Sequence, residues 1–149
     1  MNRMSKKLNK KGFTLAELLI VVAIIAVLVV VSVPIFSSKL EKAREAADVA
    51  NMRAAKAAAA ALYLSDEGSV SKDNPYYYDA DNGVLKSKKD GIKGYGQGTA
   101  TQGGITYGEY YLDNKVCKGQ IIIVTIIPPE KVDKEVEIKM DWEDPSTTS

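Results

Sequence analysis

The 149-residue chain has no histidine, and Cys117 is its only cysteine. Because histidine is the commonest general base and metal ligand, its absence removes the usual centre of acid–base and metal chemistry. One cysteine excludes an intrachain disulfide, and Cys117, in a predicted turn, is interpreted as an incidental thiol. Paired carboxylates are the acid–base arrangement that this composition still allows. We expect a non-enzymatic protein with no catalytic residue, no metal and no cofactor.

Acidic residues are missing from the first twelve positions. Five basic residues stand there, and without them the chain keeps 15 basic and 19 acidic residues, a net charge of −4. Binding to nucleic acid usually needs a positive field, so we expect no nucleic-acid partner. The five are Arg3, Lys6, Lys7, Lys10 and Lys11.

Charge is also scarce from Phe13 to Phe36, where Glu17 is the only charged residue among 24 and 17 are Leu, Ile, Val or Phe. At about 1.5 Å per residue, a helix of this length crosses a hydrocarbon core of about 30 Å. The apolar side chains favour insertion by on the order of −5 to −10 kcal/mol, against at most about 3 kcal/mol for one acid. The segment predicts a single membrane span with a cytoplasmic N-terminus.

Small residues that would mark a signal-peptidase site do not end this run, whereas Gly12 precedes it. The order of a basic leader, Gly12, Phe13, Thr14, Leu15, Glu17 and an apolar helix resembles type IV prepilins and related pseudopilins. The resemblance is close from Lys10 to about Arg44 and architectural beyond. It implies that residues 1–12 are a leader, which a prepilin peptidase removes between Gly12 and Phe13 before it methylates the new amine of Phe13. The apolar run then stays on the mature chain.

Two residues of the apolar run have a predicted role in assembly. An ionised carboxylate in apolar surroundings is costly unless it is paired, and the nearest candidate cation for Glu17 is the amine of Phe13, its own or a neighbour's. The resemblance implies the intermolecular pair; the alternative places Glu17 at the lipid headgroups. Pro34 should kink or locally open the helix. The resemblance adds that the segment before this proline loses regular structure in a filament; a plain kink is the alternative.

Glycine and proline are absent from Ser37 to Ser65, which predicts a helix over 37–65 and, with the apolar half at 13–36, one helix of about 50 residues. A seam of mostly small side chains follows it at three-four spacing. We expect this seam to let a sheet approach on one side and neighbouring helices on another. The alternative for Ala57 to Ala61 is a merely helix-favouring stretch. The seam comprises Leu40, Ala43, Ala47, Ala50, Ala54, Ala57, Ala61 and Leu64.

Residues 66–104 are predicted to form a long loop region, with a small hairpin from 76–78 to 84–85 around Asn82-Gly83. The acids of that hairpin do not fit a helix-loop-helix calcium motif, although a looser calcium site stays open. The glycine-rich stretch from Gly91 to Gly104 has no strand before it and no helix after it. It is therefore interpreted as a flexible exposed loop rather than a phosphate-binding one.

Three strands are predicted, over 105–112, 120–127 and 135–142. The nearly all-apolar second strand should be central, and the third alternates apolar and charged residues, which indicates one face on the helix and one in water. Residues 143–149 form a polar tail. The predicted fold class is α+β, with a long N-terminal helix packed on a three- or four-stranded antiparallel sheet, and residues 37–149 as the globular domain. Of the eight tyrosines, the five at 76–78 and 110–111 are either a contact surface or half-buried strand residues.

The resemblance implies a structural subunit of a type IV pilus that serves adhesion, surface motility or aggregation. Its expected partners are further copies of itself, the membrane, the peptidase and methylase, an assembly ATPase and a membrane platform. The expected location is first the membrane, as a single-pass protein, and then the extracellular pilus. The cysteine pair of many Gram-negative pilins is missing, so a Gram-positive source is expected. The alternatives are a pseudopilin of a type II secretion or DNA-uptake system, and a membrane-tethered binding module that never polymerises.

Overall fold

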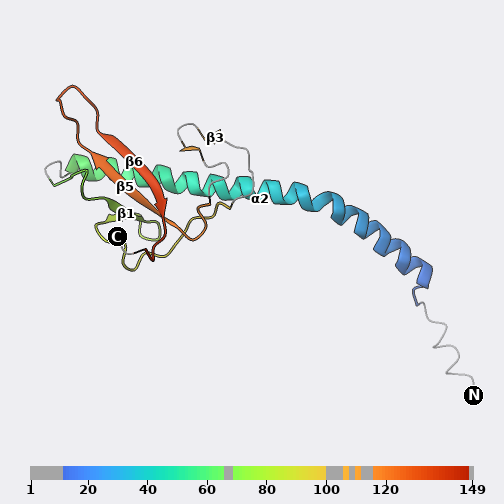
Figure 1. The fold of residues 1–149 in the computed structure, drawn as a ribbon. Helices are drawn as coiled ribbons and strands as arrows, with labels where there is room; N and C mark the ends of the chain where they lie inside the picture. The colour runs from blue at the N-terminus through green and yellow to red at the C-terminus, as the bar shows by residue number, and fades with distance from the viewer. Residues whose placement is uncertain (1–11, 66–68, 100–105, 108–109, 112–115, 148–149) are drawn as a thin grey trace, which may run out of the picture. The chain divides into compact units, whose positions relative to one another are not determined.

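A computed structural model describes residues 12–65, 69–99, 106–107, 110–111 and 116–147. The chain divides into two units, 1–37 and 38–149, which are considered separately. Helix α2, Leu15–Ser65, contributes to both and is 51 residues long (Figure 1). The expected helix of about 50 residues is therefore confirmed, as is its end before the glycine-containing half of the chain.

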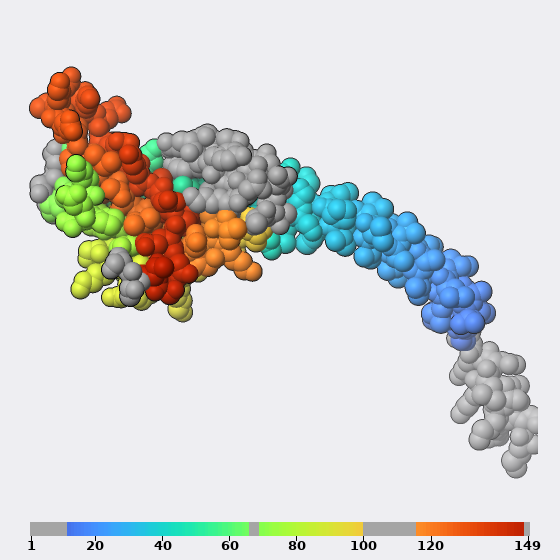
Figure 2. Space-filling view, viewed as in Figure 1, coloured from blue at the N-terminus to red at the C-terminus, as the bar shows by residue number. Residues whose placement is uncertain are grey.

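In the first unit, α2 is bare, meaning that no other described part of the chain covers its surface. Every residue from Gly12 to Ser37 is exposed, including the large apolar ones, such as Phe36 at 68% (Figure 2). By length and composition alone, α2 is able to cross a membrane. It passes through Pro34 without a break in helical assignment.

In the second unit, α2 packs on a four-stranded antiparallel sheet of order β2-β1-β5-β6 (Figure 1). The strands are β1 at Tyr76–Asp79, β2 at Val84–Lys86, β5 at Ile121–Ile127 and β6 at Glu137–Glu143. This is the α+β class that the sequence predicts. The apolar strand β5 is central as expected, and it ends before Pro128, which has no N–H to donate to a neighbouring strand.

The predicted composition of the sheet is wrong in one respect. The hairpin β1–β2, which falls in the predicted loop region, supplies half of the sheet, because Tyr77 pairs with Ile123 of β5. The predicted strand over 105–112 is instead two short strands, β3 at Thr106–Tyr107 and β4 at Tyr110–Tyr111, which pair with each other. Tyr107 and Tyr110 are antiparallel partners, so the two segments cannot belong to one continuous strand.

The face of α2 that meets the sheet is not the predicted seam. The apolar part of the buried stripe, Val49, Met52, Ala55 and Ala59, packs against β5 residues such as Ile122. All eight seam residues are exposed instead. Alanine side chains bury little area, so the larger Val49 and Met52 determine which face is covered. The seam is thus left bare along the whole of this half of the helix.

Strand β6 confirms the predicted alternation. Val136, Ile138 and Met140 pack against the core that contains Trp142, while Glu137 and Lys139 point to solvent. The connection from β5 to β6 projects from the sheet (Figure 2), and Val132 within it is fully exposed.

Candidate functional site

The start of α2 is closed by a reciprocal pair of hydrogen bonds between Thr14 and Glu17. The Glu17 N–H donates to Thr14 Oγ1 at 3.2 Å, and the Thr14 N–H donates to Glu17 Oε2 at 3.1 Å. This is a capping box, in which the last residue before the helix and the third residue within it satisfy each other's backbone donors. It fixes the first turn of α2 and directs the Glu17 carboxylate back towards the N-terminus.

Gly12 and Phe13 lie just outside the capped helix. Both residues are non-helical and exposed, Phe13 at 82%, and a Cβ added to Gly12 would meet nothing within 4 Å. A peptidase needs an accessible bond outside regular structure, and the bond between these two residues is exposed and non-helical. The Glu17 carboxylate accepts a hydrogen bond from the Thr14 N–H, one residue after Phe13. The described chain therefore gathers Gly12, Phe13 and Glu17 at one end of α2, while Pro34 lies five turns away on the same helix.

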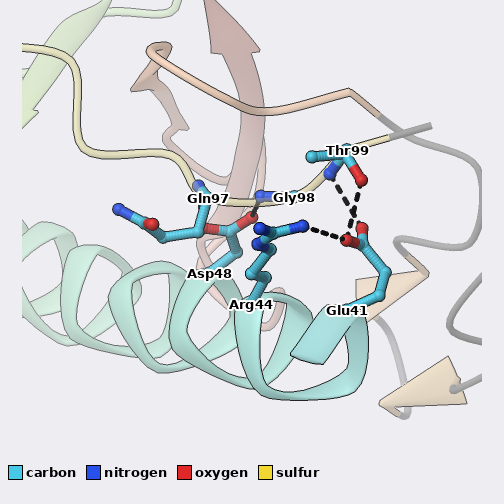
Figure 3. A network of polar contacts seen from close by, with 6 residues as sticks. All are labelled: Glu41, Arg44, Asp48, Gln97, Gly98 and Thr99. Carbon is cyan, nitrogen blue, oxygen red and sulfur yellow. Dashed lines mark hydrogen bonds and ion pairs between the residues drawn. The ribbon is translucent and has the colours of Figure 1, made fainter. Parts of the chain in front are cut away.

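A second polar arrangement lies in the globular unit, where acidic residues of α2 hold the segment Gly94–Thr99, here called the glycine strap (Figure 3). The Gln97 and Gly98 N–H groups donate to the two oxygens of Asp48 at 2.8 and 2.7 Å. The Thr99 N–H and hydroxyl donate to Glu41 at 2.8 and 2.7 Å. The backbone N–H groups of this glycine-rich segment therefore bind carboxylates, and these are the side chains of Asp48 and Glu41.

Burial and hydrogen bonding act oppositely on these two acids. Burial raises the pKa of Asp48 above its ordinary value despite the bonds from Gln97 and Gly98. Burial also acts to raise the pKa of Glu41, but the bonds from Thr99 and the charge of Arg44, whose Nη1 lies 3.3 Å away, together bring it below its ordinary value. Glu41 is therefore the acid that stays ionised most readily.

No sequence motif marks Glu41, Glu45 and Asp48 as structural residues, yet all three are fully buried. Their spacing of four and three places them on one helical face with Met52. That shared face is the signal that was available in the sequence.

The interpretation of residues 91–104 as a flexible exposed loop is wrong for the glycine strap. Gly96 and Gly98 are buried, and the strap exchanges backbone hydrogen bonds with residues 117–120. A Cβ on Gly94 would overlap the Gly119 carbonyl, and one on Gly96 would overlap the Cys117 carbonyl. These glycines therefore permit close backbone packing rather than motion.

Tyr95 of the strap is inserted between strands β1 and β5. Its hydroxyl donates to the Tyr78 carbonyl at 2.8 Å and accepts from the Ile122 N–H at 2.8 Å. Direct pairing between β1 and β5 stops at Tyr77 and Ile123. At the next position, the Tyr95 hydroxyl bridges Tyr78 and Ile122 in place of a direct backbone hydrogen bond. Burial raises the pKa of Tyr95 far above its ordinary value, which keeps this hydroxyl protonated.

The tyrosines of β1 confirm the strand interpretation. Tyr77 and Tyr78 are buried and Tyr76 is half-buried. Tyr95 packs edge-on against Tyr78 and Trp142, with ring centroids 6.2 and 5.9 Å apart. The side chains at 110–111 lie outside the described part of the chain.

Asp79 organises the turn between β1 and β2. Its Oδ1 accepts from the N–H groups of Asp81 and Asn82, and its Oδ2 accepts from Asn82 Nδ2 at 2.7 Å and contacts Lys86 Nζ at 2.8 Å. The bonds from Lys86 and Asn82 lower the pKa of Asp79 to about 2. The oxygens that a looser calcium site would need are thus engaged by the turn's own donors.

Two smaller predictions are refined. Cys117 begins a turn over 117–120 as expected, since its carbonyl accepts from the Gln120 N–H at 2.9 Å, and its side chain is fully buried in the core. The polar tail predicted over 143–149 starts one residue too early, because Glu143 belongs to β6. Lys89 Nζ lies 3.4 Å from Glu143 Oε1 and 3.3 Å from Thr147 Oγ1, which ties the tail to the loop after β2.

A comparison with known protein families points to the same end of the chain. Residues 7–33 match the family described as the prokaryotic N-terminal methylation motif. The chain is also 39% identical over 72 residues to a type IV major alpha-pilin of Moraxella bovis, covering 44% of this chain. No solved structure matches. Neither match supports the Gram-positive source expected from the missing cysteine pair.

The similarity is partial, since the chain spans 45% of the length of that curated relative. The matched motif covers Gly12, Phe13, Glu17 and most of the apolar run. The chain therefore carries a prokaryotic N-terminal methylation motif on an apolar helix with a capped start, and it is similar to a type IV pilin over part of its length.

Proposed function

We propose that this chain is a structural subunit of a type IV pilus. The observation that carries the proposal is the bare apolar helix of the first unit, which begins at a capped turn directly after the exposed Gly12–Phe13 bond. Apolar surface of this extent needs lipid or other apolar surface around it. The methylation motif and the partial similarity to a type IV major pilin support the same conclusion.

In this proposal, a prepilin peptidase cuts between Gly12 and Phe13 on the cytoplasmic side and methylates the amine of Phe13. The processed subunit waits in the membrane, and a platform protein with a cytoplasmic ATPase lifts it into the filament. Its apolar helix then exchanges lipid for the helices of other copies. Within the globular unit, the exposed alanine seam allows the helices of other copies to approach closely.

Glu17 sets the axial register of the filament in this proposal, by pairing with the amine of Phe13 of a neighbouring subunit. The capping box supports the pairing, because it already directs the carboxylate to the end of the helix where that amine forms. Pro34 adjusts the helix for packing, since its missing N–H leaves one carbonyl of the preceding turn without a donor.

Substitutions of Glu17 test the pairing. Glu17→Ala should leave cleavage and membrane insertion intact but abolish filaments, as judged by N-terminal sequencing and electron microscopy of sheared surface material. Glu17→Gln separates the two roles of this residue, because glutamine preserves the capping box and removes the charge. We expect no filaments from Glu17→Gln and normal assembly from Thr14→Ser. Normal piliation in the glutamine variant would reject the charge pair.

A pseudopilin of a secretion or DNA-uptake system would share the leader motif and the helix. Imaging of surface filaments in cells with and without this gene separates the two functions: loss of long surface pili supports the pilus subunit. A membrane-tethered module that never polymerises would give only monomer when sites near Phe13 are cross-linked at native expression.

A further inference from the structure

The turn between β1 and β2 contains Asn82-Gly83, the only Asn-Gly pair in the sequence. When glycine follows asparagine, the next peptide nitrogen can reach the side-chain carbonyl carbon, since no Cβ obstructs the approach. Gly83 N then bonds to Asn82 Cγ, and the Cγ–Nδ2 bond breaks. Nδ2 leaves as ammonia with the proton from the Gly83 nitrogen. Water opens the resulting cyclic imide to an aspartyl or isoaspartyl residue, so no oxidant or cofactor is needed.

Asp79 holds both reacting groups. The nucleophile, the Gly83 nitrogen, donates its proton to the Asp79 carbonyl oxygen at 2.8 Å. The leaving group, Asn82 Nδ2, donates to Asp79 Oδ2 at 2.7 Å. Asp79 Oδ1 also accepts from the Asn82 N–H at 3.3 Å. For the attack to occur, the Gly83 N–H must lose its partner and the carboxamide must swing towards it, so both bonds must break.

The charge of Asp79 opposes the reaction as well. Its side chain is buried, and Lys86 Nζ at 2.8 Å stabilises it as a carboxylate. A fixed negative charge beside Gly83 disfavours removal of the proton from that nitrogen and disfavours the negative charge that develops on the Asn82 oxygen.

We propose that Asn82 is a deamidation site of this protein and that Asp79 keeps it unreactive while the β1–β2 turn is intact. Conversion would replace a donor to Asp79 with a second carboxylate. Two like charges at hydrogen-bonding distance repel each other, so the modified turn would not re-form as it was. Deamidated Asn82 therefore accumulates only in chains whose hairpin has opened, and the modification makes further opening more frequent.

The test uses the full chain in detergent micelles at mildly alkaline pH, with conversion of the Asn82 peptide followed by mass spectrometry. The folded wild type should convert at least about tenfold more slowly than the same chain in urea, since two hydrogen bonds must break first. Asp79→Ala removes the carboxylate that holds Asn82 Nδ2 but keeps the backbone carbonyl that accepts from Gly83, so it should lose a measurable part of this protection while circular dichroism shows a folded chain. Lys86→Met, which keeps the Asp79 bonds within the turn, should retain most of it.

Equal rates in the folded and urea-unfolded wild type would overturn the proposal, and this comparison stands even when Asp79→Ala fails to fold. A folded Asp79→Ala protein that converts at the wild-type rate would also overturn it. Loss of ammonia without uptake of water, with Lys86 joined to position 82, would show a cross-link in place of deamidation and would likewise contradict the proposal. Gly83→Ala in urea should slow conversion and thereby confirm the site.

Discussion

At the scale of single residues, this protein uses polar side chains to complete backbone hydrogen bonding where regular structure stops. The Tyr95 hydroxyl completes the gap between β1 and β5, Asp48 accepts two N–H groups of the glycine strap, and Asp79 accepts those of a turn. A buried N–H or C=O without a partner costs about 1–3 kcal/mol, so each of these side chains has a measurable effect on stability.

The hydroxyl of Tyr95 should contribute strongly to folding. Tyr95→Phe leaves the Tyr78 carbonyl and the Ile122 N–H facing each other across a gap too wide for a direct bond, so we expect the free energy of unfolding to fall by about 2–4 kcal/mol. Fluorescence of Trp142, the only tryptophan, follows the urea transition because its ring packs on Tyr95. Tyr76→Phe, in the regular ladder of β1, is the matched control. A change of similar size in both variants would contradict the assignment.

Asp79 should make the hairpin sensitive to acid. Its pKa is lowered to about 2 in the folded chain, from an ordinary 3.8. The stabilisation is therefore complete above the ordinary value and is lost as the pH falls towards about 2. The difference in stability between the wild type and Asp79→Asn should be largest near neutral pH and vanish at the acid end of this window. Urea titrations at a series of pH values measure it, and a difference independent of pH would refute the role.

At the scale of elements, the glycine strap determines how the helix and the sheet fit together. Carboxylates of α2 hold one side of the strap, and the chain before β5 holds the other through backbone bonds. The strap also carries Tyr95 into the sheet. The buried face of α2 accordingly changes from acidic, at Glu41 to Asp48, to apolar, from Val49 onward.

Gly96 should therefore be the least replaceable position of the strap. Gly96→Ala would place a methyl group on the Cys117 carbonyl, and relief requires backbone displacement, which should cost about 3 kcal/mol or more. Gly91→Ala has open space around its Cβ and a φ of 79°, so strain alone should cost about 1 kcal/mol. Thermal unfolding of both variants provides the comparison. Equal destabilisation would mean that packing at Gly96 is looser than described.

The sequence was most informative where periodicity and length determine structure. The long helix, the central strand β5 and the alternation of β6 follow from patterns that single segments carry. The glycine strap, buried Asp48 and inserted Tyr95 could not be predicted in this way, because each depends on which distant backbone donors face it. In the sequence, glycines at 94 and 96 are compatible with either a mobile loop or a close backbone contact. The structure distinguishes the two, because Gly119 and Cys117 lie directly against them.

At the scale of the whole molecule, the exposed apolar half of α2 needs an apolar environment. A permanent membrane anchor would explain its apolar surface but not the Gly12–Phe13 bond left exposed before a capped helix, nor the lone carboxylate of Glu17. We propose instead that the membrane stores the subunit and that the same surface later forms the centre of a filament.

The N-terminal residue of protein sheared from the cell surface tests this claim most directly. Filament and membrane fractions are separated by centrifugation, and the N-terminal peptide of each is identified by mass spectrometry. The account predicts an N-methylated Phe13 as the first residue in the filament fraction. Sheared filaments whose subunits still begin at Met1, or a processed chain that is found only as monomer in membranes, would contradict it.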